Sequence, residues 1–276
     1  MVHDTPDSDL SPQFPVPEAV PTPTDAPAPR TPWTLRNLLV LIVTSLIALL
    51  AANMLVVAGY AALQPIMGWP KISQAVHNNP FLLLALQSVF HALIFLTIYL
   101  FIVVNHRLPF WETLMWQTPA APKALLFFLG GIALAVAIQI MPPLLPDRDD
   151  FPLTRLFTSP QAGYAIAAFA ILIAPFMEEL IFRGVLFSFF QHLAGDRVAV
   201  LGTAALFAVL HVPEYWGAWN HVLLILLVGL VFSGARGVTG SLVPSVILHV
   251  AYNGSLMTAL FIQTRHFRDV QAILTQ

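Results

Sequence analysis

Long apolar runs without a charged side chain dominate the sequence after residue 36. No Asp, Glu, Lys or Arg occurs in residues 37–70, 72–106, 124–146, 215–235 or 237–264. An uncharged apolar stretch of about 18 or more residues is typical of a helix that crosses a membrane. Backbone polar groups in lipid must be satisfied within their own segment, so these stretches are predicted as helices. The pattern predicts an all-α fold, a polytopic bundle of transmembrane helices.

We expect seven spans. The fourth apolar stretch is too long for one straight crossing of a ~30 Å core, and Pro175 can kink it. The count becomes eight if this stretch forms two elements. The predicted spans are Leu38–Leu63, Phe81–Val104, Ala124–Ile140, Ala162–His192, Val198–His211, Trp219–Ala235 and Leu242–Gln263.

Residues 1–32 differ from the rest of the chain. They contain nine of the 23 prolines and five of the 14 acidic residues, with Arg30 as their one Lys or Arg. Proline fixes φ and lacks an amide donor, so we predict a disordered, extended tail before a transmembrane domain at residues 33–276. No short apolar core with a small-residue cleavage site precedes the first span, which argues against a removed signal peptide.

Composition and charge narrow the classes of protein further. The chain is 58% apolar and 9% charged, against about 25% charged residues in an ordinary soluble domain. This excludes a soluble enzyme or a disordered regulator, and a net charge of −2 gives no basic footprint for nucleic acid. We expect an integral protein in contact with membrane lipid, in a bacterial inner membrane. The distribution of Lys and Arg favours a cytoplasmic N-terminus.

Three ionisable side chains lie inside the fourth apolar stretch, where charges are costly and functional by default. They are Glu178, Glu179 and Arg183, in the segment APFMEELIFRGVLF. Glu179 and Arg183 are four residues apart and can pair on one helix face, whereas Glu178 is rotated by about 100°. We interpret Glu179–Arg183 as a structural ion pair and Glu178 as a general base facing a polar cavity. A network that only holds the bundle together would leave one carboxylate unpaired at a high cost.

Two membrane histidines and an asparagine add to this set. His211 ends the fifth predicted span in LFAVLHVPEYW, and His249 lies in the last span in PSVILHVAYNGS. Asn253 follows His249 by four residues and therefore shares its helix face. A lone membrane histidine is often only hydrogen-bonded to another helix, but polar groups on three helices can converge at one depth. We predict that Glu178, His211, His249 and Asn253 form one catalytic site.

This set of side chains is suited to the hydrolysis of an amide. A carboxylate and an imidazole can activate a water, either directly or through a bound metal. A second imidazole with an amide can hold the metal or donate to a developing oxyanion. Nitrogen and oxygen ligands suit a divalent cation such as zinc, which Glu178, His211 and His249 would bind. The sequence contains neither the zincin motif H-E-x-x-H nor the nucleophile elbow G-x-S-x-G.

Three short motifs carry a resemblance to a known family. Residues 178–183 read E-E-x-x-x-R, residues 207–211 read F-x-x-x-H, and residues 249–253 read H-x-x-x-N. In order and spacing they resemble the CPBP family of CAAX proteases and bacteriocin-processing enzymes, also called the Abi or type II CAAX prenyl endopeptidase family. The resemblance covers residues 160–260, which we expect to form the catalytic core.

The resemblance implies an intramembrane endopeptidase acting on a peptide or membrane-protein substrate. At the matched positions, Glu178 with His211 activates the water, while His249 and Asn253 serve the oxyanion or a metal. A metal-dependent enzyme, with zinc as its cation, is the reading we favour. Eukaryotic members cleave the last three residues from prenylated CAAX proteins, whereas bacterial members process other peptides or serve in immunity and regulation.

Two other functions use the same residues. A proton-coupled transporter would employ Glu178 and His211 as a relay, although the sequence shows no repeated pair of Gly/Pro-broken spans in two halves. A non-catalytic membrane partner would use the polar cluster only for assembly. Placement of the four side chains on opposite flanks, well over a dozen ångströms apart, would rule out a shared catalytic site.

Overall fold

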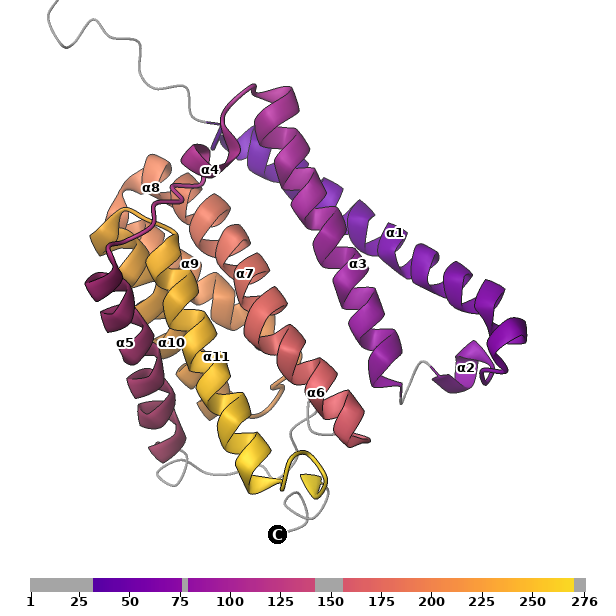
Figure 1. Ribbon diagram of the computed structural model, residues 1–276. Helices are drawn as coiled ribbons and strands as arrows, with labels where there is room; N and C mark the ends of the chain where they lie inside the picture. Colours follow the sequence, from indigo (N-terminus) through magenta and orange to yellow (C-terminus); the bar gives the residue numbers. More distant parts are fainter. Residues whose placement is uncertain (1–31, 76–78, 142–155, 271–276) are drawn as a thin grey trace, which may run out of the picture. The chain divides into compact units, whose positions relative to one another are not determined.

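The computed structural model describes residues 32–75, 79–141 and 156–270, and every regular element within them is helical (Figure 1). The predicted all-α class is confirmed for this part of the chain. The predicted disordered tail lies outside the described residues, apart from Pro32. The elements are α1 (Leu35–Met67), α2 (Ile72–Ala75), α3 (Pro80–Tyr99), η2 (Leu100–Asn105), α4 (Phe110–Thr113), α5 (Ala121–Ile140), α6 (Pro160–Ala168), η5 (Phe169–Ile173), α7 (Ala174–Glu179), η6 (Leu180–Leu186), α8 (Phe187–Ala194), α9 (Asp196–His211), α10 (Trp219–Thr239) and α11 (Val243–Gln263).

Six helical runs in the described residues are long and apolar enough to cross a membrane. The predicted count of seven is not confirmed, because α9 has 16 residues and a length of ~24 Å, against a ~30 Å hydrocarbon core. The fourth stretch is a single continuous run, so the division that would give eight spans is not seen either. The six runs are Leu35–Met67, Pro80–Asn105, Ala121–Ile140, Pro160–Ala194, Trp219–Thr239 and Val243–Gln263.

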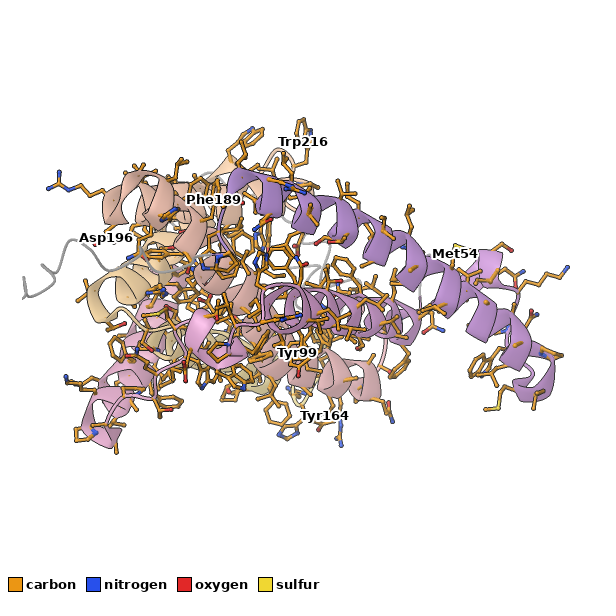
Figure 2. All side chains as sticks on the ribbon, turned by 90° about the horizontal axis from the view of Figure 1, so that it is seen from above. Met54, Tyr99, Tyr164, Phe189, Asp196 and Trp216 are labelled. Atoms are coloured by element: carbon orange, nitrogen blue, oxygen red, sulfur yellow. The ribbon has the colours of Figure 1, made fainter. Side chains whose placement is uncertain are left out.

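The outer faces of these helices carry large apolar side chains. Met54 on α1 is 73% exposed and Leu126 on α5 is 68% exposed. Figure 2 shows side chains extending outward along α1, around the labelled Met54. A helix that is apolar on its outer face as well as its inner face is suited to lipid rather than water. The protein is an integral membrane protein.

A wide helical turn, η5, precedes α7. The amide of Ala174 donates to the carbonyl of Phe169, five residues back, which is the π-helical pattern. Pro175 follows and has no amide hydrogen, so neither the α-helical nor the π-helical donor is available to the carbonyl of Ala170. The side chain of Asn253 on α11 supplies the missing donor: its Nδ2 donates a hydrogen bond of 2.8 Å to the Ala170 oxygen. A side chain of the last helix therefore stabilises the irregular turn that the sequence predicts near Pro175.

A second wide turn, η6, follows α7. Here the amide of Phe187 donates to the carbonyl of Phe182, again five residues back. The carbonyl of Arg183 accepts a hydrogen bond of 3.2 Å from Nε of the buried Arg236 on α10. The segment α7, which carries both glutamates, is therefore held at its two ends by side chains of α11 and α10.

Glycines allow the helices around the site to approach closely. A Cβ on Gly131 of α5 would overlap the carbonyl oxygen of Leu248 on α11. A Cβ on Gly229 of α10 would lie 3.3 Å from the backbone of Ala204 on α9. Small residues at such positions permit close backbone packing in membrane proteins. They place α5 against α11 and α10 against α9.

The N-terminal half supplies one further wall. Helix α1 packs along α3, and α3 contacts α6 (Figure 1). The ring of His91 on α3 lies edge-on to Phe169, with ring centroids 5.5 Å apart. This contact brings the middle of α3 against the helical run that carries the paired glutamates.

Candidate active site

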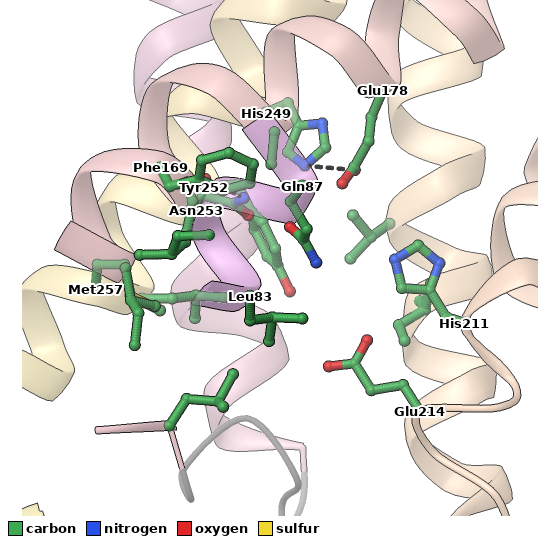
Figure 3. A pocket seen from close by; sticks show the side chains of 18 of the residues that line it. Leu83, Gln87, Phe169, Glu178, His211, Glu214, His249, Tyr252, Asn253 and Met257 are labelled. Atoms are coloured by element: carbon green, nitrogen blue, oxygen red, sulfur yellow. Dashed lines mark hydrogen bonds and ion pairs between the residues drawn. The ribbon is translucent and has the colours of Figure 1, made fainter. Parts of the chain in front are cut away.

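A cavity of about 340 Å³ lies between α3, α6, α7, α9, α10 and α11. All four side chains predicted to be catalytic line it: Glu178, His211, His249 and Asn253 (Figure 3). They come from three helices and from positions up to 75 residues apart in the sequence. Most of the remaining wall is aliphatic or aromatic. The structure therefore gathers the predicted polar groups in a pocket with largely apolar surroundings, while their catalytic roles remain a prediction.

Glu178 faces the cavity. Its side chain retains 28% exposure, and its Oε2 lies 3.7 Å from Nε2 of His249, the contact drawn as a dashed line in Figure 3. The adjacent Glu179 is fully buried, with no exposed side-chain surface. Successive residues of a helix are rotated by about 100°, so one glutamate turns to the cavity while the other turns into the protein.

Glu179 forms the predicted ion pair and has a second contact that the spacing did not show. Its Oε1 accepts from Nη1 of Arg183 at 2.9 Å and from Nδ1 of His249 at 2.9 Å. With Nδ1 held in this way, Nε2 is the imidazole nitrogen that is directed toward Glu178. The other carboxylate oxygen of Glu179, Oε2, is buried and has no hydrogen-bond partner within the described residues. Glu179 thus couples the buried cation to the orientation of His249.

Arg183 is held from several sides. Its Nε donates to Oγ of Ser233 at 3.2 Å, and its Nη2 donates to the carbonyl of Gly229 at 3.0 Å. The guanidinium lies 4.8 Å from the ring centroid of Phe207, within cation–π range. These contacts to α10 and α9 satisfy the planar donor fork of an arginine that has no exposed side-chain surface.

His211 reaches the cavity from the end of α9. Its Nδ1 lies 2.6 Å from the carbonyl oxygen of Phe207. A carbonyl oxygen can only accept, so Nδ1 carries the hydrogen and Nε2 of the neutral ring has a free lone pair. Figure 3 shows the His211 ring directed into the same cavity as the Glu178 carboxylate. The neutral tautomer can therefore accept a proton at Nε2.

Asn253 has a structural contact as well as a place in the cavity wall. One hydrogen of its Nδ2 is used by the carbonyl of Ala170 in η5. The amide nitrogen carries a second hydrogen, and its Oδ1 is an acceptor. Asn253 can therefore hold the π turn and still offer a donor to a molecule in the cavity.

Gln87 and Glu214 also line the cavity and belong to none of the motifs. Gln87 comes from α3, and Glu214 comes from the loop between α9 and α10 (Figure 3). The backbone amides of Glu214 and Tyr215 both donate to the carbonyl of His211 at 3.1 Å, which places Glu214 about one turn beyond that histidine. Its spacing of three from His211 is the signal that could have indicated it. For Gln87 the signal is a polar side chain inside an apolar run, one turn before His91, which by itself favours an interhelical hydrogen bond over a site residue.

Glu214 is the acidic residue of the site that lies outside the membrane-spanning helices. Burial raises the pKa of the Glu214 carboxyl, and the negative charge of Glu178 raises it further, while His211 lowers it. Part of the side chain remains accessible, and Glu214 lines the cavity. The direction of the pKa change follows from the water contacts that the carboxylate loses on burial.

The expected zinc ligands do not form a ready metal site. Within residues 32–75, 79–141 and 156–270, no three His, Cys, Asp or Glu side chains are grouped closely enough to hold a metal ion. Glu178 and His249 are near one another at 3.7 Å, but His211 does not complete a three-donor set with them. In this arrangement the residues do not fit a metal, and zinc remains a prediction from the sequence.

A carboxylate and two imidazoles in a cavity between membrane helices are the groups expected in a membrane-embedded peptidase. Residues 160–255 match the family model described as type II CAAX prenyl endopeptidase Rce1-like. This segment is about a third of the chain and contains all three motifs. The resemblance predicted from the motifs is confirmed, and it supports a protease of the CAAX type in the membrane.

A curated relative and the solved structures complete the comparison. The UPF0177 protein YbdI of Lactococcus lactis subsp. lactis is 25% identical to the chain over 135 residues. This alignment covers 49% of the present chain and 70% of that protein. No solved structure matches the chain significantly.

Proposed function

We propose that the protein is an intramembrane endopeptidase that hydrolyses a peptide bond with water activated by Glu178 and His211. The observation that carries the proposal is the meeting of both side chains with His249 and Asn253 in one cavity. The match of residues 160–255 to a peptidase family supports it. The substrate would be a peptide or a membrane protein whose cleaved segment enters between the helices.

Glu178 is the general base of this mechanism. Its carboxylate faces the cavity and is not tied up by the Arg183 ion pair, which Glu179 occupies. A water between Glu178 and Nε2 of His211 would lose a proton to the carboxylate as its oxygen attacks the peptide carbonyl. The proton then passes to the nitrogen of the leaving amine, so the C–N bond breaks and the two peptide ends are released. Nε2 of His211 is the acceptor that orients the water, since Nδ1 is engaged by Phe207.

His249 and Asn253 stabilise the developing oxyanion. The imidazole of His249 can donate from Nε2 when both of its nitrogens carry hydrogens, and its Nδ1 is held by the Glu179 carboxylate at 2.9 Å. The second hydrogen of Asn253 Nδ2 is available as a further donor. Donors fixed before the reaction stabilise an oxyanion most effectively, because they do not have to reorganise. The contacts of Glu179 and Ala170 provide this fixation.

A cleavage assay with a matched pair of variants tests the proposal. The protein is reconstituted into liposomes and supplied with internally quenched peptides, including one with a prenylated CAAX end. Glu178→Gln is expected to lower cleavage at least about 100-fold, the range for loss of a general base. Glu112→Gln, on α4 outside the cavity, is expected to cleave as the wild type does. Undiminished cleavage by Glu178→Gln would contradict the role of Glu178 as the base. No cleavage by the wild type would favour a transport relay or an assembly role.

The same pair of variants tests the zinc prediction. Elemental analysis of the purified proteins is expected to find about one zinc per chain in the wild type and in Glu112→Gln if Glu178, His211 and His249 are its ligands. Glu178→Gln would then retain much less. An active wild-type protein without zinc would contradict the metal-dependent reading and leave the water-activating role of Glu178 intact.

We further propose a bacterial inner membrane with the N-terminus in the cytoplasm. The support is the weak excess of Lys and Arg on the loops that this orientation places inside. Reporter fusions to the two ends of α5 would test the orientation, because they must lie on opposite sides of the membrane.

A further inference from the structure

The described part of the cavity wall carries two carboxylates and no Lys or Arg. The carboxylates are those of Glu178 and Glu214, and the imidazoles of His211 and His249 line the same cavity. Glu178 has the imidazole of His249 at 3.7 Å. In contrast, neither a hydrogen bond nor an ion pair reaches the Glu214 carboxylate from the described part of the chain. Glu214 is therefore a charged group in the cavity that the proposed hydrolysis does not use.

Glu214 is placed in the cavity by its backbone. The turn after α9 is fixed by two amide hydrogen bonds to the carbonyl of His211. Figure 3 shows the Glu214 carboxylate pointing into the cavity on the side where His211 lies. The side chain thus stands beside a residue proposed to orient the attacking water, and a group bound to it would lie close to the scissile bond.

The surroundings of Glu214 favour a positively charged ligand. The wall around it is largely apolar; burial and the charge of Glu178 work against the ionised carboxylate, while the neighbouring His211 favours it. A carboxylate in such a place is costly unless a cation or several donors compensate it. An ammonium or guanidinium group would supply both positive charge and hydrogen-bond donors. An uncharged or acidic substrate group would supply no compensating charge.

We propose that Glu214 determines specificity by binding a cationic group of the substrate next to the peptide bond that is cleaved. This inference rests on the proposed peptidase function and names the substrate class of the same site. The cation is either the side chain of a Lys or Arg or the free α-amine at the substrate's N-terminus, because both offer the same ammonium-type chemistry. Glu214 binds and positions the substrate and takes no part in bond cleavage.

Binding measurements separate this inference from the peptidase proposal. The full chain carrying Glu178→Gln is reconstituted and titrated with fluorescent peptides that have Lys, norleucine or Glu at successive positions. Each peptide is used with a free and with an acetylated N-terminus. Norleucine keeps the aliphatic stem of Lys without its charge. Fluorescence anisotropy then reports affinity without any need for cleavage.

The expected result is a preference of about tenfold or more for Lys over norleucine at one position, the range for a charge-assisted hydrogen bond. Adding Glu214→Gln is expected to remove most of this preference, and Glu214→Lys to favour the Glu peptide instead. Adding the control Glu112→Gln is expected to leave the preference as it was. If the effect follows acetylation and not the Lys position, the α-amine is the cation.

Two outcomes would overturn the inference. One is an equal affinity for the charged and the neutral peptides, and the other is a Lys preference that survives Glu214→Gln. If the wild type cleaves none of the peptides but the Lys preference in binding still depends on Glu214, the peptidase proposal alone would be overturned. Wild-type kinetics complete the test, because a specificity residue is expected to change the ratio of kcat/KM between the Lys and norleucine peptides.

Discussion

The two walls of the cavity differ in how firmly their polar side chains are held. On the wall formed by α7 and α11, His249 is bound by Glu179, and Glu179 is bound by Arg183. On the wall formed by α9 and the following loop, His211 has one backbone contact, and the Glu214 carboxylate has neither hydrogen bond nor ion pair among the described residues. Both walls face the same space, but one is braced by a buried network and the other is not.

This difference indicates a division of labour. Groups that stabilise a transition state gain from being fixed in advance, because reorganisation during the reaction reduces their effect. Groups that recognise a substrate must instead be left with unused bonding capacity for that substrate. The braced wall is therefore suited to chemistry, and the less constrained wall to orienting water and binding substrate. The predictions that follow test the two walls separately.

The largest effect is expected from Arg183→Met on the braced wall. Removing the guanidinium leaves a buried carboxylate without its cation, which costs about 3–5 kcal/mol of unfolding free energy. Arg265→Met is the matched control, because Arg265 pairs with Asp269 at 3.7 Å while its side chain is 84% exposed. An exposed pair contributes only about 0–1 kcal/mol. Denaturant unfolding in detergent measures both, and equal losses would contradict the braced-wall interpretation.

A smaller effect is expected from Glu179→Gln. The amide can still accept from Nδ1 of His249, but it no longer places a negative charge beside the imidazole. Residues that orient a functional histidine in this way typically contribute about 10–100-fold. We expect a fall of this size in kcat for peptide cleavage, with little change in KM, on protein that elutes from a sizing column as the wild type does. An unchanged kcat would show that the negative charge of Glu179 beside His249 does not matter.

The smallest effect is the pH dependence of stability from Glu214. Because burial raises the pKa of this carboxyl, the folded protein holds the proton more tightly than the unfolded chain. The contribution of Glu214 to the free energy of unfolding is therefore most favourable at low pH. It declines as the pH rises from the ordinary pKa of a glutamate to the raised pKa of the folded protein. Glu214→Gln removes this decline, so its Tm relative to the wild type is expected to rise with pH. Thermal unfolding between about pH 4 and 8 measures it, and parallel Tm curves would contradict it.

Charge-free apolar runs were sufficient to predict the helical class and most of the spans. The predicted span at α9 was not confirmed. The segment is apolar, but a helix of 16 residues is too short to reach across a membrane. The pattern of hydrophobicity also does not show the two wide turns around α7. These depend on hydrogen bonds from Asn253 and Arg236 on distant helices, which no local sequence pattern contains.

The candidate site was predictable where helical spacing determines it. The division between Glu178 and Glu179 follows from adjacent positions on a helix, and the Glu179–Arg183 pair follows from a spacing of four. The contact between Glu179 and His249 joins residues 70 positions apart, so only the fold reveals it. Glu214 and Gln87 were not predicted as site residues, since neither lies in a motif. The spacing of three from His211 is a local signal for Glu214, whereas Gln87 enters the cavity through the packing of α3.

The two π turns beside α7 have an evolutionary implication. A wide turn accommodates an additional residue within a helix while the segments on either side keep their facing. Insertions or deletions of one residue in η5 are therefore expected to be tolerated more readily than the same change in α7, or in η6 before Arg183, where the spacing of four from Glu179 must be kept. A deletion inside α7 would rotate the helix by about 100° per residue and bring one glutamate into the place of the other, so alignments of relatives should show length variation before this pair and none between the pair and Arg183.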